Sequence, residues 1–231
     1  MLARKRSVVA FVAVGIASLL ILPVQMSIAQ PPNLDRIIFI DYVGPAHATP
    51  LGTDCGPDSQ RYSKLGVKWA SFPVKYSIDT TGSGVDPTAA TTAIVNALNS
   101  WDNEEHPAGT FFASGTPAQL TIGWEAMDGP GGALATAIIT YNVATKNIVS
   151  AQVRFDSGDS WAVYPSLSCS SQGTAFDIED VMAHEAGHVV GLGHTSGAKN
   201  VALTMYPFAS AGETLKRTLG TGDKKGIDGI Y

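Results

Sequence analysis

Residues 184 to 194 read His184-Glu185-Ala186-Gly187-His188-Val189-Val190-Gly191-Leu192-Gly193-His194, and the organisation of the chain depends on them. A helix places residues i and i+4 on one face, so His184 and His188 project side by side with Glu185 adjacent. Two imidazoles placed in this way can bind one Zn²⁺, with the carboxylate close by. Gly191 allows a positive φ, which lets the chain leave the helix and bring His194 to the same ion. Three protein ligands leave a fourth zinc position open for water, which is typical of a catalytic site.

The spacing of these residues resembles the long motif of the metzincins, a family of zinc peptidases, which reads His-Glu-x-x-His-x-x-Gly-x-x-His. All five fixed positions of the motif are present. A buried amphipathic helix with incidental histidines is the alternative. The other two histidines, His47 and His106, lie in Pro/Gly-rich surroundings, and we interpret them as surface residues. The resemblance implies an α+β fold with a twisted mixed β-sheet, an active-site helix, a Met-turn and a C-terminal helix.

Residues 1–29 have the features of a secretory signal peptide. Arg4, Lys5 and Arg6 form a basic start, an apolar run from Val8 to Leu22 follows, and Ser27-Ile28-Ala29 is a small-x-small cleavage site. We therefore expect export, with cleavage near Ala29. An uncleaved membrane anchor is the alternative, although the apolar run is short for a membrane span.

Composition indicates one globular domain, because the chain has 231 residues, of which 45% are hydrophobic and 15% are charged. Removing the three basic residues of the leader changes the formal net charge from −5 to −8, which disfavours nucleic acid or an anionic membrane as a partner. We expect an N-terminal arm or short propeptide at residues 30–61, with one apolar segment at 37–40, and a catalytic domain at 62–231. We expect this domain to be a monomer.

Hydrophobic periodicity predicts the elements around the motif. Strands are expected at residues 74–78, 120–124, 133–141 and 148–155. A first helix should have Asp86 as its N-cap and Pro87 at its first position, and it should end before Pro107. The motif helix should begin near Asp177, where acidic residues suit a helix N-terminus. A last helix should run from about Gly222 to the end.

Two further segments make the chain similar to the matrixins, the matrix-metalloproteinase-like branch of the metzincins. They are Met205-Tyr206-Pro207 and the C-terminal Gly226-Ile227-Asp228-Gly229-Ile230-Tyr231. The resemblance covers roughly Tyr62 to Tyr231. It implies a Met-turn beneath the zinc at Met205, and a wall of the S1′ pocket formed by Tyr206 and Pro207. Plain core packing would also suit Met205, since a Met-turn methionine packs and does not bind the metal.

Other metzincin branches match the sequence less well. A snapalysin-like peptidase has Asp as its third ligand, where this chain has His194. An astacin-like or serralysin-like tyrosine ligand would stand two residues after the methionine, where this chain has Pro207.

The matrixin resemblance also implies a strand edge that binds substrate. Asp128-Gly129-Pro130-Gly131-Gly132-Ala133-Leu134-Ala135 is similar to the turn that leads into this edge in matrixins. By that match, Leu134 and Ala135 would bond the substrate backbone. In this mode of binding main-chain hydrogen bonds provide affinity and pockets provide selectivity.

The same turn in matrixins binds a structural Ca²⁺ together with two acids after the next strand. Here the corresponding residues are Asp128, Gly129, Gly131, Asp156 and Asp159. Carboxylate and carbonyl oxygens suit Ca²⁺, and a plain acidic turn is an equal alternative. The structural zinc of the family should be missing, because Thr136 and Arg154 stand where matrixins place histidines. We therefore expect one catalytic zinc. For the acidic turn, a calcium site and a plain turn remain equal alternatives.

Cys55 and Cys169 are the two cysteines of the chain. An even pair in an exported protein is typical of a disulfide. Alternatively, the segment from Cys55 to Asp58 resembles the cysteine switch of matrixin proenzymes, where a thiolate takes the fourth zinc position. It departs from that pattern because Asp54 replaces an Arg and one residue is missing before Pro57.

The resulting hypothesis is a secreted zinc endopeptidase. His184, His188 and His194 would hold the zinc, and Glu185 would act as general base towards the attacking water. A secreted protein that keeps the zinc scaffold without catalysis is the alternative from another class. Retention of Glu185 favours the enzyme, since a decayed enzyme would most easily lose that residue.

Overall fold

The computed structural model describes residues 33–44, 59–102, 110–168 and 170–231, and the described residues belong to one compact unit. The predicted signal peptide, His47, His106, Cys55 and Cys169 lie outside the described residues. Within the described segments, no helix combines the length and the apolar character needed to cross a bilayer.

A mixed β-sheet forms the centre of the unit, with the strand order β12-β1-β7-β8-β6-β4-β5 and β3 paired with β8. Its strands are β1 (Leu34–Val43), β3 (Lys68–Trp69), β4 (Val74–Ile78), β5 (Phe112–Ser114), β6 (Leu120–Glu125), β7 (Ala133–Asn142), β8 (Asn147–Asp156) and β12 (Phe208–Ala209). Strand β7 is antiparallel to both of its neighbours, and the other described strand pairs of this sheet are parallel.

Two small sheets lie outside this sheet. One pairs β2 (Ser63–Lys64) with β11 (Leu192–Gly193), and the other pairs β9 (Trp161–Ala162) with β10 (Phe176–Asp177). Short 3-10 turns occur at η1 (Ala198–Asn200) and η2 (Leu215–Arg217). Strands β11 and β10 flank the central helix, so each end of that helix is held by a short strand pair.

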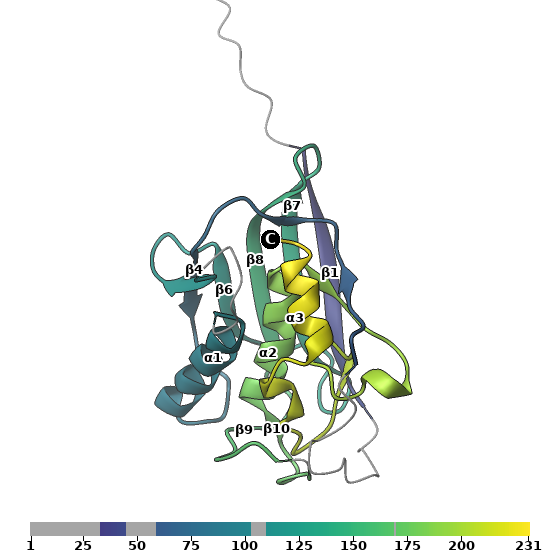
Figure 1. The fold of residues 1–231 in the computed structure, drawn as a ribbon. Coiled ribbons are helices and arrows are strands. Elements are labelled where there is room, and N and C mark those ends of the chain that lie inside the picture. Colours follow the sequence, from purple (N-terminus) through teal and green to yellow (C-terminus); the bar gives the residue numbers. More distant parts are fainter. Residues whose placement is uncertain (1–32, 45–58, 103–109, 169) are drawn as a thin grey trace, which may run out of the picture. The chain divides into compact units, whose positions relative to one another are not determined.

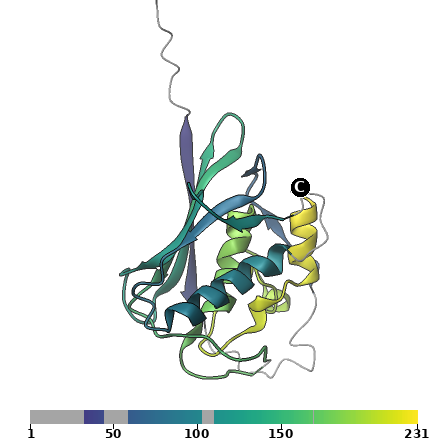
Figure 2. The same cartoon turned by 90° about the vertical axis from the view of Figure 1, so that its left-hand side faces the viewer.

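Three helices cover one face of the main sheet, as Figures 1 and 2 show together. They are α1 (Pro87–Asp102), α2 (Ile178–Val189) and α3 (Thr221–Asp228). Helix α2 lies between the sheet and α3, and it packs against α1 along its side. The helix that carries the first two histidines is therefore enclosed on several sides.

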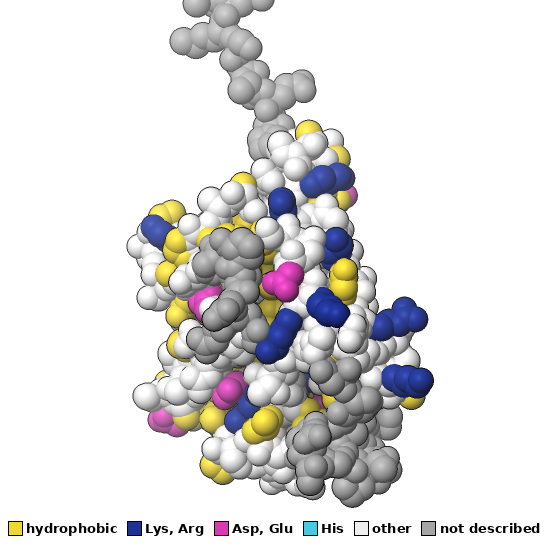
Figure 3. All heavy atoms as spheres, in the orientation of Figure 1, with side chains coloured by type: hydrophobic (Ala, Val, Ile, Leu, Met, Phe, Trp, Pro, Cys, Tyr) yellow, Lys and Arg dark blue, Asp and Glu magenta, His cyan; other side chains and the backbone are white. Residues whose placement is uncertain are grey.

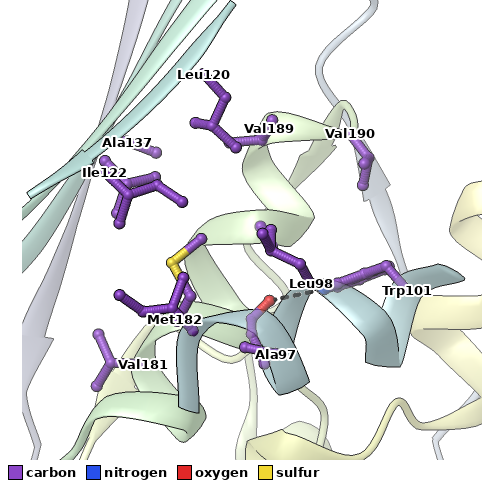
Figure 4. Close-up of a cluster of buried hydrophobic side chains, with 14 of the residues drawn as sticks. Ala97, Leu98, Trp101, Leu120, Ile122, Ala137, Val181, Met182, Val189 and Val190 are labelled. Atoms are coloured by element: carbon purple, nitrogen blue, oxygen red, sulfur yellow. Dashed lines mark hydrogen bonds between the residues drawn. The ribbon is translucent and has the colours of Figure 1, made fainter. Parts of the chain in front are cut away.

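The core is formed by apolar side chains of α1, α2 and the inner face of the sheet (Figure 4). Leu98 and Trp101 of α1 and Met182 of α2 belong to this cluster, and all three are almost completely buried. The Trp101 indole N–H donates to the carbonyl of Ala183, 2.9 Å away. A buried indole needs such an acceptor, so this bond helps to fix the distance and rotation of α2 against α1.

The sequence predicts most of these elements correctly. The expected strands and helices correspond to β4, β6, β7, β8, α1, α2 and α3, with ends that agree within a few residues. Asp86 accepts from the Ala89 amide at 2.9 Å, as expected of an N-cap. The mixed sheet, the active-site helix and the C-terminal helix confirm the α+β fold.

Strand β1 adds to what the sequence predicts for residues 30–61. The apolar segment at residues 37–40 is part of a ten-residue strand that pairs with β7 from Leu34, opposite Asn142, to Tyr42, opposite Ala133. Because the partner of β1 is about 100 residues away, local periodicity gives little indication of this pairing. The domain start near Tyr62 stays a prediction, while residues 34–43 lie in the same sheet as the predicted domain.

The face of the molecule seen in Figure 3 carries Lys and Arg side chains interspersed with acidic ones. Apolar side chains appear there mostly as small separate groups. Such scattered exposure is ordinary for a folded domain.

Candidate metal centre

Helix α2 begins and ends where its sequence requires. The Asp177 side chain accepts from the Asp180 amide at 2.9 Å and so caps the first turn. At the other end Gly191 has φ = +101°, a conformation that favours glycine. A Cβ at this position would lie 2.8 Å from the Val67 carbonyl oxygen. The expected reversal after the helix is therefore present, and it turns the chain back towards α2.

This reversal brings three histidines together. The Nε2 atoms of His184, His188 and His194 lie 3.1 Å apart in each of the three pairs. The Nδ1 of His184 lies 2.6 Å from the Thr204 carbonyl oxygen, and the Nδ1 of His188 lies 2.8 Å from that of Leu192. A carbonyl oxygen only accepts, so both Nδ1 atoms carry the proton and both Nε2 atoms present lone pairs.

The donor set fits zinc. Lone pairs on facing Nε2 atoms cannot hydrogen-bond to one another, whereas an ion at the usual Zn–N distance of about 2.0–2.1 Å can bind all three. Carbonyl acceptors on the outer nitrogens are the usual way in which metal-binding histidines are oriented. Among the described residues, two groups of His, Asp or Glu side chains bring three possible ligand atoms within 4.8 Å of one another. One group is this triad, and the other is Asp41, His184 and Glu185.

Burial keeps these imidazoles neutral. It lowers the pKa values of His184 and His188 well below the usual range, and the neighbouring histidines lower them further. Burial also lowers the pKa of His194 to about 4. Neutral imidazole is the form that binds a metal, so the site is in its binding form at neutral pH.

Glu185 is completely buried next to the triad. Neither of its carboxylate oxygens has a hydrogen-bond partner among the described residues. Burial raises the pKa of Glu185, and the nearby Asp41 raises it further. A buried carboxylate without donors is unfavourable, so this group is poised to interact with a water or substrate that brings donors of its own.

A turn beneath the histidines is held by the C-terminal helix. Met205 is buried below α2, so close that a Cβ on Gly187 would overlap its sulfur. The buried carboxylate of Asp223 accepts from the amides of Thr204 and Met205 at 2.9 and 3.2 Å. The Thr204 carbonyl in turn orients His184. Met205 therefore lies where a Met-turn is expected, and Asp223 is a positioning residue that sequence reasoning missed.

Leu134 and Ala135, the predicted substrate-binding residues of β7, are both fully buried. Their strand edge is paired with β1, where Asp41 lies opposite Ala135. On its other side β1 pairs in parallel with β12, with Tyr42 opposite Phe208. The predicted wall residues Tyr206 and Pro207 directly precede β12 and are half-buried. The two predicted sides of the substrate channel therefore flank β1.

Two residues of β1 reach the metal centre, and sequence reasoning missed both. The Phe39 ring stacks on His188 with ring centroids 3.9 Å apart, and it meets His194 edge-on at 5.3 Å. The Asp41 carboxylate lies near His184 and Glu185. In the sequence, the acidic residue Asp41 directly follows the apolar segment 37–40. An acidic residue at this place is unusual only if the segment lies in the sheet, which the sequence alone does not establish.

The predicted calcium residues also lie together. Asp156 accepts from the amide of Gly129 at 3.1 Å, and Asp159 accepts from that of Gly131 at 2.9 Å. The other Asp159 oxygen is buried without a hydrogen-bond partner among the described residues. Burial raises the pKa of Asp159, and the carboxylates of Asp156 and Asp128 add to this. These carboxylates would gain from a cation between the two turns.

Comparison with known proteins agrees with this geometry. A model of the matrixin family matches residues 68–231 of the chain. Karilysin from Tannerella forsythia is 26% identical over 188 residues, which cover 77% of this chain and 36% of karilysin. Human matrilysin is 29% identical over 190 residues, which cover 77% and 64% of the two chains. Mouse stromelysin-3 is 36% identical over 104 residues, which cover 45% and 18%. The chain spans less than two thirds of the length of each of these relatives.

Proposed function

Because this chain belongs to the matrixin family of metalloendopeptidases, we propose that it hydrolyses internal peptide bonds in protein or peptide substrates. The observation that carries the proposal is the convergence of three Nε2 atoms beside the buried carboxylate of Glu185. Neutral nitrogen donors next to a carboxylate without donors supply a metal site and a base in one place.

The chain's own residues have distinct roles in this mechanism. Zinc, when bound, supplies a Lewis acid that lowers the pKa of a water to about 7 and polarises the scissile carbonyl. His184, His188 and His194 hold the ion in an orientation set by backbone carbonyls. Glu185 takes the proton from the attacking water and hands it to the leaving amine. Its raised pKa makes it a stronger base than an exposed carboxylate.

The test replaces Glu185 by Gln in the zinc-loaded chain and measures cleavage of a pool of quenched fluorescent peptides. We expect bound zinc to stay at one per chain and cleavage to fall by roughly 10²–10⁴-fold, the usual contribution of a general base. Glu179→Gln is the matched control, because Glu179 lies on the same helix but pairs with Arg217. Cleavage at the wild-type rate by the Glu185→Gln protein would refute the assignment.

The alternative is a secreted zinc-binding protein on the same scaffold. The geometry favours it less, because Glu185 is kept and its carboxylate has no hydrogen-bond partner in the part of the chain that the structure describes. It would be supported by a chain that binds one zinc but cleaves no peptide of the pool. Treatment with phenanthroline supplies the second control, since only zinc-dependent cleavage disappears on chelation.

For substrate binding we propose the channel between β7 and β12. Leu134 and Ala135 would bond an extended peptide backbone, while Tyr206 and Pro207 would form the wall of the pocket for the following side chain. This assignment is supported by the position of β7 and β12 on the two sides of β1, the strand that reaches the metal centre. Main-chain pairing of this kind accepts many sequences and leaves selectivity to the pockets.

We also propose a structural Ca²⁺ held by the carboxylates of Asp128, Asp156 and Asp159 with the carbonyls of Gly129 and Gly131. The buried Asp159 oxygen without a partner supports it, because oxygen ligands of this kind suit Ca²⁺. Addition of Ca²⁺ should raise the unfolding temperature of the wild type and not that of Asp159→Asn. An equal rise in both proteins would place the ion elsewhere.

For processing we propose a signal peptide at residues 1–29, a catalytic domain at 62–231 that acts as a monomer, and a disulfide between Cys55 and Cys169. The basic, apolar and small-residue segments support export. Mass spectrometry of the secreted protein tests all three points. It should find Gln30 at the N-terminus, two fewer hydrogens than in the reduced chain, and the mass of one chain under native conditions.

A further inference from the structure

We propose that a pocket beside the C-terminal end of α3 binds an oxyanion of the sulfate or phosphate type through Lys64, Lys68 and Lys146. The pocket has a volume of about 230 Å³. It is formed by the segment that joins β2 to β3, by the turn between β7 and β8, and by the residues that follow α3. No residue of the metal centre or of the proposed substrate channel lines it, so the inference goes beyond the proposed function and does not rest on it.

The charge of this pocket differs from that of the chain as a whole. The chain has 20 acidic and 15 basic residues, whereas the described lining of the pocket contains three lysines and neither Asp nor Glu. Asp228 at the end of α3 is exposed and does not line the pocket. Lys and Arg side chains lie around this end of α3 on the face seen in Figure 3. Cations that share a pocket repel one another, and an anion between them removes this repulsion.

Two of the lysines are held in place without being neutralised. The Nζ of Lys64 donates to the Gly229 carbonyl oxygen at 3.1 Å, and the Nζ of Lys68 donates to that of Ile230 at 3.2 Å. An ammonium group has three N–H donors, so each lysine keeps donors for a ligand. The ion pairs found within the described segments involve other cations. Lysines that bond the last carbonyls of a helix are common, so these two bonds alone would indicate a helix cap.

Lys146 is the lysine that a helix cap does not explain. Its φ is +60°, and it is the one non-glycine residue with a positive φ in the part of the chain that the structure describes. Asn, Asp or Gly adopts this conformation at lower cost, so the geometry of the turn does not select a lysine. The Lys146 carbonyl oxygen accepts from the Lys68 amide at 3.1 Å, which places the two residues side by side.

The side chain of Lys146 lies on the side of the sheet that the helices cover. Its Nζ is 5.4 Å from the centroid of the Tyr141 ring, and Tyr141 packs against the core between the sheet and the helices. The Nζ of Lys68 similarly lies 5.9 Å from the centroid of the Tyr231 ring. Ammonium groups that come from separate segments suit a tetrahedral oxyanion, because its oxygens accept hydrogen bonds from several directions.

The pocket adjoins the reversal that returns His194 to the metal centre. A Cβ on Gly191 would lie 2.8 Å from the Val67 carbonyl oxygen and 3.4 Å from the Cδ1 of Ile230, and both of these residues line the pocket. An anion there joins three segments that meet behind this reversal. Because it binds the folded chain, it should raise the unfolding temperature.

The test measures the unfolding temperature of the full zinc-loaded chain in sodium sulfate and in sodium chloride of equal ionic strength. Sulfate also stabilises proteins because it is excluded from their surfaces, and this general effect should be equal in matched variants. We expect the wild type to gain more from sulfate than Lys146→Gln does. Isothermal titration calorimetry should find that Lys146→Gln binds sulfate about five-fold more weakly than the wild type, and that Lys146→Arg binds it like the wild type.

Lys75→Gln is the matched control. Lys75 is an exposed lysine of β4 that does not line the pocket, so this variant should bind sulfate like the wild type. Equal binding of sulfate by the wild type and Lys146→Gln would overturn the inference. A loss in Lys75→Gln as large as that in Lys146→Gln would also overturn it, because the anion would then respond to net charge alone.

Two further titrations identify the source of the oxyanion. Tighter binding of a sulfated tetrasaccharide than of inorganic sulfate, weakened in Lys146→Gln, would support a sulfate group carried by a larger ligand. Tighter binding of inorganic phosphate than of the tetrasaccharide, weakened in the same variant, would support a free ion. These measurements do not involve peptide cleavage, so they can fail while the proposed function holds, and they can succeed while it fails.

Discussion

Strands β1 and β7 lie side by side in one sheet, yet the protein holds them in different ways. β7 buries several apolar side chains completely, while the apolar side chains that β1 packs against the core, Ile37, Phe39 and Val43, are only partly buried. Burial of apolar area is the main source of folding stability. The difference indicates that β7 contributes more to the stability of the core than β1 does.

Removal of zinc should produce the largest difference between β1 and β7. If zinc is present at about a thousand times its dissociation constant, its loss costs about 4 kcal/mol of unfolding free energy. The loss also frees the rings of His188 and His194, on which the Phe39 ring of β1 packs. We therefore expect chelation to raise amide hydrogen exchange in β1 more than in the centre of β7. Equal protection of both strands after chelation would show that β1 does not depend on the metal.

Matched isoleucine truncations should come next. Ile37 of β1 and Ile139 of β7 face each other in the register, and Ile139 is completely buried while Ile37 is half-buried. Ile139→Ala should lower the free energy of unfolding by about 3 kcal/mol, and Ile37→Ala by less than about 1 kcal/mol. Urea unfolding of the two variants measures both values. Similar losses would mean that β1 is part of the core.

The buried carboxylates of Asp41 in β1 and Asp223 in α3 can be compared in the same way, by the hydrogen bonds that each accepts. Asp223 accepts three backbone amides, from Thr204, Met205 and Gly220, while among the described residues the Asp41 carboxylate has at most the adjacent Tyr42 amide near it. Asn at position 223 leaves at least one of these N–H groups facing another donor, so Asp223→Asn should cost about 2 kcal/mol. It should also weaken zinc binding, because Thr204 orients His184.

Asp41→Asn is the control for this pair. It removes the negative charge that raises the pKa of Glu185, so the unfolding free energy should fall by less than in Asp223→Asn. Thermal unfolding at equal zinc loading compares the two variants. A loss in Asp41→Asn as large as that in Asp223→Asn would mean that Asp41 is hydrogen-bonded in solution.

The sequence predicts the part of the site that local spacing controls. His184, His188 and Glu185 follow from helical geometry, and the turn that returns His194 follows from the positive φ of Gly191. The positions of Asp41 and Asp223 depend on contacts between segments far apart in the chain. No local period records such contacts, so the centre could be predicted from the sequence while its covering strand and its supporting carboxylate could not.

The smallest effect is expected where β1 and β7 touch far from the metal. The Tyr141 hydroxyl of β7 donates to Asp35 of β1 at 3.1 Å on an exposed part of the sheet. Exposed hydrogen bonds exchange readily with water, so their net contribution is small. Tyr141→Phe should leave the unfolding midpoint within the scatter of repeat measurements. A clearly lower midpoint for Tyr141→Phe would show that this outer contact contributes to the pairing of β1 with β7.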